Sequence, residues 1–141
     1  MRLWHKDLIP FLPRQQLLGQ WRECCLIAKN IHNNGTPNHL LVNKIMNYPF
    51  EHFYTYCYEV ACEMKYRGYK IDYYNFLKWI SAEKHTPIIT HDKVFKDWHD
   101  DRYLRQCIFN LEEKAMCGGI SQDEWAQIFN IYGSKFNLWN F

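Results

Sequence analysis

The 141-residue sequence contains no apolar run near the ~18 residues of a membrane-spanning helix, and its first residues lack the apolar stretch of a signal peptide. We therefore expect a cytoplasmic protein with no membrane contact. Net charge is also low, because 17 Lys and Arg stand against 15 Asp and Glu, which leaves +2. A bulk polycation is excluded, so any anion-binding surface must be local. We expect it mainly in residues 1–72, which carry nine basic and six acidic side chains.

The cysteines also lack a pattern, because none of them forms a C-x-x-C pair. On a helix, Cys24 and Cys25 would point about 100° apart, and Cys57 and Cys62 about 140° apart, so neither pair converges on a metal ion. We expect reduced, buried, unreactive thiols and no bound metal or other cofactor. A Cys/His metal protein is the alternative. The six cysteines are Cys24, Cys25, Cys57, Cys62, Cys107 and Cys117.

Helical periodicity is what the sequence does contain. The apolar spacing predicts three main helices and two shorter ones, over about 14–31, 49–66, 100–116, 72–84 and from the capping box at 121–124. Prolines and turn residues predict an irregular start over 1–13, a loop at 33–38 and a brief extended piece at 86–90. No repeat or linker divides the chain. We expect an all-α fold, with residues 1–141 forming a single compact domain.

The helix predicted over 14–31 has two faces. Its amide-rich face carries Gly19, which costs about 1 kcal/mol of helix propensity but allows a ligand to approach closely. Arg22 and Glu23 are adjacent, a spacing poor for a mutual salt bridge, so each is available to a separate partner. An arginine can hold a phosphate, and a carboxylate can stabilise a cation or move a proton. A solvated surface is the alternative. The predicted core face holds Leu17, Trp21, Cys24, Ala28 and Ile31; the other face holds Gln15, Gln16, Gly19, Arg22, Glu23, Leu26 and Asn30.

The segment RQQLLGQWRE, residues 14–23, follows a chain start of Met-Arg and resembles the pyrimidine-dimer DNA glycosylase family, typified by phage endonuclease V. ACEMKYRGYKI (61–71), NLEEKA (110–115) and IYGSK (131–135) are similar to later segments of that family, in the same order. The resemblance implies an endonuclease V-like all-α fold. It implies excision of one linkage at a cyclobutane pyrimidine dimer in duplex DNA, and then β-elimination at the abasic site without a cofactor. We expect a monomer.

The family's nucleophile is the chain's own α-amine, which forms an imine with the deoxyribose C1′. An α-amino group has a pKa of about 7.7–8.0, so part of it is neutral at physiological pH. The resemblance assigns this role to Met1. The phage member loses its initiator Met and begins Thr-Arg, whereas the bulky Arg2 here predicts that Met1 is retained. Glu23 is expected to stabilise the oxocarbenium-like sugar and assist proton transfers, and Arg22 to clamp a phosphate beside the lesion.

Further DNA contacts follow from the same resemblance. The expected DNA-binding residues are Arg2, Gln15, Arg22, His39, Lys114, Tyr132 and Lys135. Leu26 and Asn110 stand where the family has arginine, which predicts lower and less salt-sensitive affinity for DNA. For His39 the alternative is a solvated loop histidine. For the aromatic residues of the C-terminal tail the alternatives are core packing and a disordered tail.

Two other functions are compatible with these residues. One is a glycosylase or lyase for a different base lesion, which a panel of damaged duplexes would separate. The other is a non-catalytic nucleic-acid or protein interaction module that keeps the fold; low net charge and the two missing arginines favour it. Salt-dependent DNA binding without turnover would identify that module.

Overall fold

Helices make up all the regular structure of residues 1–80 and 87–141, the part of the chain that the computed structural model describes. The α-helices there are α1 (Arg14–Asn34), α2 (Phe50–Tyr66), α3 (Tyr74–Leu77), α4 (Asp101–Met116) and α5 (Gln122–Phe136). The same residues include the short 3-10 helices η1 (Lys6–Phe11), η2 (Asn43–Asn47) and η4 (His91–Lys93). The expected all-α fold is confirmed, and α1, α2 and α4 match the three main helices.

Local chemistry sets the ends of α1 and α5. α1 begins after Pro13 and ends at Gly35, whose φ of 75° is left-handed and whose N–H donates to the Ile31 carbonyl. The predicted capping box is present, because the Ser121 side chain accepts from the Glu124 N–H while the Glu124 carboxylate accepts from the Ser121 N–H. This cap opens a helix of 15 residues, so the last helix is longer than expected.

Three other segments differ from expectation. The start is not wholly irregular, because His5 Nδ1 accepts a hydrogen bond from the Asp7 N–H and opens η1, which includes Pro10. In the helix expected over 72–84, only Tyr74–Leu77 is α-helical, and residues 81–84 lie outside the described part of the chain. Of the piece expected to be extended, residues 87–90 have no regular structure and Thr86 is not described.

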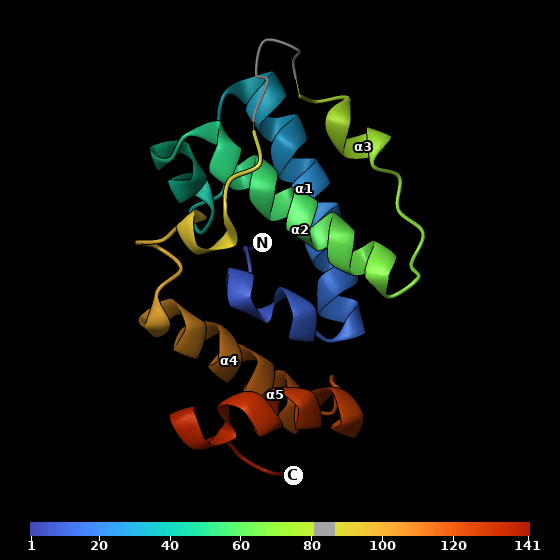
Figure 1. Cartoon of the computed structure of the whole chain (residues 1–141), viewed down its shortest axis with the longest axis vertical. Helices are drawn as coiled ribbons and strands as arrows, with labels where there is room; N and C mark the ends of the chain where they lie inside the picture. The colour runs from blue at the N-terminus through green and yellow to red at the C-terminus, as the bar shows by residue number, and fades with distance from the viewer. Residues whose placement is uncertain (81–86) are drawn as a thin grey trace.

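The α-helices form two groups. α1 packs against α2 and α3, and α4 packs against α5, as Figure 1 shows. The first thirteen residues, blue in Figure 1, lie between the two groups, and η1 contacts both α2 and α5. The N-terminus therefore lies near the centre of this view and the C-terminus at its edge.

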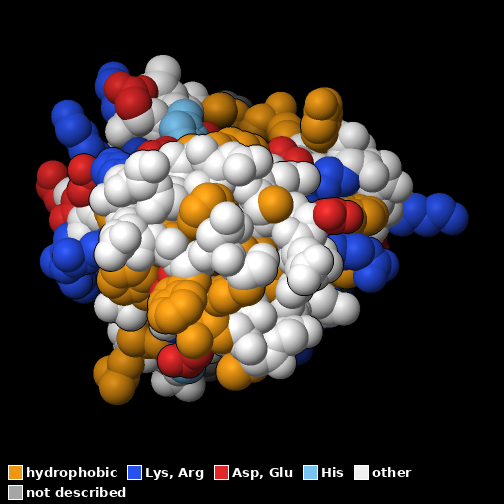
Figure 2. Space-filling view, turned by 90° about the horizontal axis from the view of Figure 1, so that it is seen from below, with side chains coloured by type: hydrophobic (Ala, Val, Ile, Leu, Met, Phe, Trp, Pro, Cys, Tyr) orange, Lys and Arg blue, Asp and Glu red, His pale blue; other side chains and the backbone are white. Residues whose placement is uncertain are grey.

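The α5 side of the molecule carries apolar and neutral side chains over most of its area. In Figure 2, which shows this side, most charged side chains lie at the edges of the view. The C-terminal tail is fixed here, since Trp125 Nε1 donates to the Trp139 carbonyl (2.9 Å) and the Trp139 N–H donates to Glu112 (2.9 Å). Within α5, a Cβ at Gly133 would come within 2.9 Å of the Phe129 ring, so this position needs glycine.

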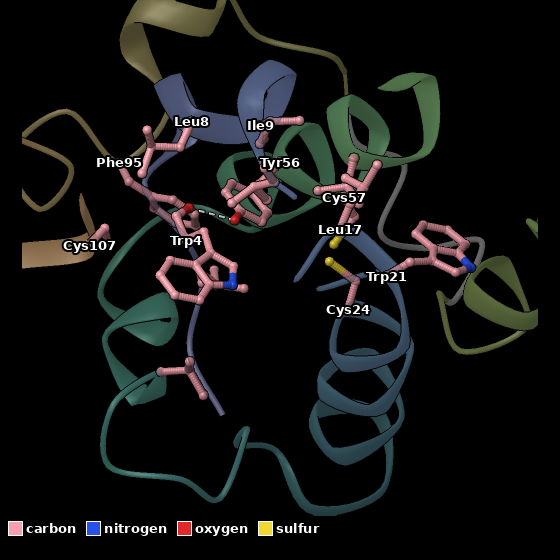
Figure 3. Close-up of a cluster of buried hydrophobic side chains, with 14 of the residues drawn as sticks. Trp4, Leu8, Ile9, Leu17, Trp21, Cys24, Tyr56, Cys57, Phe95 and Cys107 are labelled. Atoms are coloured by element: carbon pink, nitrogen blue, oxygen red, sulfur yellow. Dashed lines mark hydrogen bonds between the residues drawn. The ribbon is translucent and has the colours of Figure 1, made fainter. Parts of the chain in front are cut away.

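The predicted core face of α1 is confirmed, because Leu17, Trp21, Cys24, Ala28 and Ile31 are all buried. Helix α2 lies opposite this face, and Figure 3 shows the sulfur atoms of Cys24 and Cys57 pointing toward each other between the two helices. Trp4 and Phe95 close the same core from the N-terminal segment and from the loop before α4. Full burial of such side chains contributes about 1.5–3 kcal/mol each.

The cysteines follow the expectation of burial only in part. Cys24, Cys25, Cys57 and Cys107 are buried, whereas Cys62 and Cys117 are exposed. Burial raises the pKa of Cys25 to about 11, which keeps the thiol protonated near neutral pH. Cys62 is exposed because Cys57 takes the α1-facing position and Cys62 lies about 140° further around α2. Among the described residues, no three His, Cys, Asp or Glu side chains group as metal ligands would. In the same part of the chain, no helix combines the length and apolarity needed to cross a membrane.

Candidate active site

The backbone of residues 2–4 is held by the side chain of Gln20 on α1. Gln20 Oε1 accepts a hydrogen bond from the Trp4 N–H (2.7 Å), and Gln20 Nε2 donates to the Arg2 carbonyl (3.0 Å). The side chain is only 1% exposed, so these bonds form away from water, where an unmet polar group is costly. One amide therefore satisfies two backbone groups and fixes this segment against α1.

Two tyrosines complete this support. The Tyr56 hydroxyl on α2 donates to the Trp4 carbonyl (2.6 Å), as Figure 3 shows, and the Tyr103 hydroxyl on α4 donates to the Leu3 carbonyl (2.6 Å). Burial raises the pKa of both tyrosines, so their hydroxyls remain protonated donors. The carbonyls of residues 2, 3 and 4 are each bound by a side chain from a different helix.

Glu23 joins this support to the start of the chain. Its Oε2 accepts a hydrogen bond from the Arg2 N–H at 3.2 Å. Only the Cα and carbonyl carbon of Met1 separate the Arg2 nitrogen from the Met1 nitrogen, so the carboxylate lies close to the first residue. Both residues open into a cleft of about 380 Å³ between α1 and α4. The cleft is lined by Met1, Arg2, Trp4, Gln16, Gly19, Gln20, Glu23, Asn110, Glu113 and Lys114.

The α1 wall of the cleft is open above Gly19. A Cβ built there would meet only the Arg22 guanidinium within 4 Å, at 3.7 Å from Nη2, so Arg22 reaches back to the rim of the cleft. Gln16 lines the same wall, and its Oε1 is buried with no hydrogen-bond partner among the described residues. A ligand in the cleft can therefore approach the α1 backbone closely at Gly19.

The sequence model of the pyrimidine dimer DNA glycosylase family matches residues 1–74, which is more than half of the 141-residue chain. The chain belongs to the pyrimidine dimer DNA glycosylase family. It is thus a DNA repair glycosylase, and its substrate is DNA. No curated protein and no solved structure matched the chain. The matched range contains the N-terminal segment, α1 and α2, and it ends before α4.

Four of the residues expected in the glycosylase site share the cleft: Met1, Arg2, Glu23 and Lys114. Arg22 lies at its rim and also lines a neighbouring hollow with Lys29 and Lys78. Glu23 and Arg22 thus face separate surroundings, as their spacing on the helix predicts. Gln15 is exposed one turn before Gly19 and is not part of the cleft lining.

The other three expected DNA-binding residues lie outside the cleft. Within the loop after α1, His39 Nδ1 accepts a hydrogen bond from the Leu41 N–H (3.3 Å). Tyr132 is half-buried against the Phe136 ring, with 6.0 Å between ring centroids. Lys135 pairs with Asp101 on α4 at 3.4 Å.

Sequence reasoning missed the residues that position the N-terminal segment. Gln20 lies between Leu17 and Cys24 on the apolar side of α1, and a polar residue in that place signals a buried hydrogen-bonding role. Tyr56 and Tyr103 carry no such signal, because nothing near them in the sequence identifies an acceptor near residue 3.

The two positions without the family's arginine differ in surroundings. Asn110 lines the cleft itself, one helical turn before Lys114. Leu26 is 44% exposed and lines the hollow beside Arg22. Among the side chains that line the cleft, Arg2 and Lys114 are balanced by Glu23 and Glu113, so the side chains supply no excess of positive charge.

Proposed function

We propose that this glycosylase cuts one glycosidic bond of a cyclobutane pyrimidine dimer in duplex DNA and then cleaves the abasic site, using the Met1 α-amine as nucleophile. The hydrogen bond between the Arg2 N–H and Glu23 carries the proposal, because it places a carboxylate next to the first residue. The Gln20 and tyrosine contacts support it, since they orient the same segment. Pre-positioning of reacting groups is a main source of enzymatic rate.

The reaction uses one amine and one carboxylate. The neutral α-amine attacks C1′, the bond from C1′ to the base breaks with its electron pair leaving on the base, and the base takes up a proton. The C1′–O4′ bond then breaks with its electron pair on O4′, O4′ takes up a proton and the amine nitrogen loses one, which gives the ring-opened imine. Removal of a C2′ proton expels the 3′ phosphate, and water hydrolyses the imine to free the amine. Glu23 stabilises the cationic sugar and carries protons, while Arg2, Arg22 and Lys114 bind phosphates.

Borohydride trapping tests the nucleophile. Sodium borohydride added with an abasic-site duplex should reduce the imine to a stable adduct, and peptide mass mapping should place that adduct on Met1. Lys114 offers a second amine in the cleft, so the Lys114→Arg variant is the matched control. It should trap as wild type does. Loss of the adduct in this variant, or an adduct mapped to a lysine, would contradict the Met1 assignment.

The Glu23→Gln variant tests the carboxylate. It keeps the size of the side chain and an acceptor for the Arg2 N–H, so folding and DNA binding should be unchanged. Strand cleavage should fall by about 100-fold or more, the usual scale for loss of a general acid–base group. Single-turnover cleavage and a binding titration, done on the same duplex, separate the two. Unchanged cleavage would remove Glu23 from the mechanism.

A different base lesion is the second candidate substrate, and Asn110 favours it. This amide lines the cleft at a position where the family has an arginine. Cleavage rates on duplexes with a pyrimidine dimer, an oxidised base, an alkylated base or an abasic site would rank the substrates. The dimer should rank first among the base lesions.

A further inference from the structure

The loop between α1 and η2 displays two leucines to solvent. Leu40 is 90% exposed and Leu41 is 56% exposed. Burying a leucine stabilises a protein, and the free protein does without most of that stabilisation at both positions. Adjacent leucines at the tip of a loop contribute little to the core, so their exposure calls for another explanation.

Hydrogen bonds within the loop hold the two leucines in this exposed position. His39 organises it from within, since its N–H donates to Asn43 Oδ1 (3.0 Å) and its carbonyl accepts from the N–H groups of Val42 (3.1 Å) and Asn43 (2.9 Å). Val42 is fully buried and anchors the end of the turn. The two leucines therefore project from a fixed turn.

A second cleft lies beside these leucines and has a cationic lining. It encloses about 310 Å³ and is lined by Arg2, Leu40, Leu41, Lys44, Trp98, Arg102, Tyr103 and Gln106. Three of these lining residues are cationic and none is acidic. A surface that combines exposed apolar side chains with cations alone matches a ligand with both stacked rings and phosphates, which is nucleic acid.

The second cleft neighbours the candidate active site. Arg2 lines both clefts. On α4, Arg102 and Gln106 line the second cleft and Asn110 lines the first, at successive spacings of four residues on one helix face. A duplex lying along this face of α4 would meet the leucines and Glu23 together.

We propose that Leu40 and Leu41 form an apolar wedge that enters the base stack beside the lesion, while Arg2, Lys44 and Arg102 bind the flanking phosphates. The inference rests on the proposed action on duplex DNA. Proteins that distort DNA commonly insert leucine between base steps. Unstacking costs least at damaged bases, so the wedge would act preferentially at the lesion. A second copy of this chain is the poorer occupant, because a symmetric contact would bring the same cations face to face.

The test is the double variant Leu40→Ala/Leu41→Ala on a duplex with 2-aminopurine next to an abasic site. Wild type should raise the fluorescence as it unstacks the probe, and the variant should lose most of that rise. Duplex cleavage should slow by about 10-fold or more, because the variant no longer offsets the cost of unstacking a base step. Cleavage of the same abasic site in single-stranded DNA should stay within about 2-fold, because no stack has to be opened.

Leu77→Ala on α3 is the matched control, since this exposed leucine lines neither cleft, and it should behave as wild type. Unchanged unstacking by the double variant would overturn the wedge, and so would an equal loss of cleavage on duplex and single strand. Gel filtration tests whether a second copy of this chain occupies the surface instead. If the wild type is a dimer that the double substitution dissociates, and unstacking is unchanged, the wedge is also overturned. Unstacking by a wild-type protein that cleaves nothing would refute the proposed function and leave the wedge in place.

Discussion

Two clusters of ionisable groups flank the first seven residues. They differ in how many of their hydrogen-bond donors and acceptors already have a partner within the protein. In the first cluster, the buried Lys6 ammonium donates to the carbonyls of His91 (2.9 Å), Asp92 (3.0 Å) and Val94 (2.7 Å). An ammonium has three protons, so its capacity is exhausted. Lys6 thereby ties η1 to the segment that follows residue 90.

His91 in this first cluster is also saturated. Its Nδ1 lies 2.8 Å from Glu59 and its Nε2 lies 2.7 Å from Asp7, so both ring nitrogens have carboxylate partners. Burial lowers the pKa of His91, but the hydrogen bonds to Asp7 and Glu59 outweigh it, and the pKa is raised overall. The hydrogen-bonding groups of the Lys6 and His91 side chains therefore all have partners within the protein.

The cleft contains the opposite arrangement. Glu23 accepts a single hydrogen bond within the described part of the chain, from the Arg2 N–H. Lys114 and Arg22 make no ion pair with any described residue, and Gln16 keeps a buried acceptor free. Unused hydrogen-bonding capacity thus distinguishes the proposed active-site cluster from the cluster around Lys6 and His91, although both contain Lys, His or Glu.

Lys6→Met should give the largest change in stability. It leaves three carbonyls without their donor, one of them buried and two partly buried, so the free energy of unfolding should fall by about 3 kcal/mol. Urea unfolding measures this, with the exposed Lys96→Met as control. Cleavage per folded molecule should change little. A stable Lys6→Met protein with impaired cleavage would reverse the roles of the two clusters.

Gln20→Leu should affect stability and function together. Loss of the bonds to Trp4 and Arg2 should reduce the free energy of unfolding by about 2 kcal/mol. Because the first residue is then less well positioned, borohydride trapping should slow by about 10-fold or more in the folded protein. Gln16→Leu removes an amide from the same helix without breaking these bonds and should keep its stability. Trapping at wild-type rate in folded Gln20→Leu would show that this clamp is structural only.

Lys114→Ala should weaken DNA binding by a few-fold and make the salt dependence shallower by about one unit of slope. Lys135→Ala is the matched change at a lysine paired with Asp101 outside the cleft, and it should have less effect. Equal losses in the two variants would extend the DNA-binding surface to α5, as the family resemblance implies.

The smallest expected effect is the pH dependence contributed by His91. Since its pKa is raised in the folded state, its stabilisation is fully present below the unfolded value of about 6.5 and is lost as pH rises through the folded value. The stability difference between wild type and His91→Gln should therefore be larger at pH 6 than at pH 9. The half-exposed site limits it to below about 1 kcal/mol. A difference that grows with pH would contradict this sign.

Contacts local in the sequence were predictable. Periodicity located α1, α2 and α4 and the buried face that includes Cys24, and the Ser121 capping box located the start of α5. The family resemblance led to Glu23 and Lys114, which do share a cleft. These features depend on residues within a few positions of each other or on a motif.

Long-range placement was not predictable in the same way. The bond from Tyr103 to the Leu3 carbonyl spans 100 positions, and that from Tyr56 to Trp4 spans 52. Helical periodicity gives no information about which distant carbonyl a tyrosine will meet. The same limit applies to Leu40 and Leu41, which form part of a site only because Arg102 on α4 lies beside them.

The hydrogen bonds that hold residues 2–4 come from three helices, so they can form only in a certain order while the chain is synthesised. These residues leave the ribosome first, yet their partners Gln20, Tyr56 and Tyr103 emerge over the next hundred positions. Such non-local contacts form late, because a long loop must close before they are made. The support of residues 2–4 is therefore complete only once Tyr103 on α4 has been made, so a chain that ends before α4 lacks the hydrogen bond to the Leu3 carbonyl.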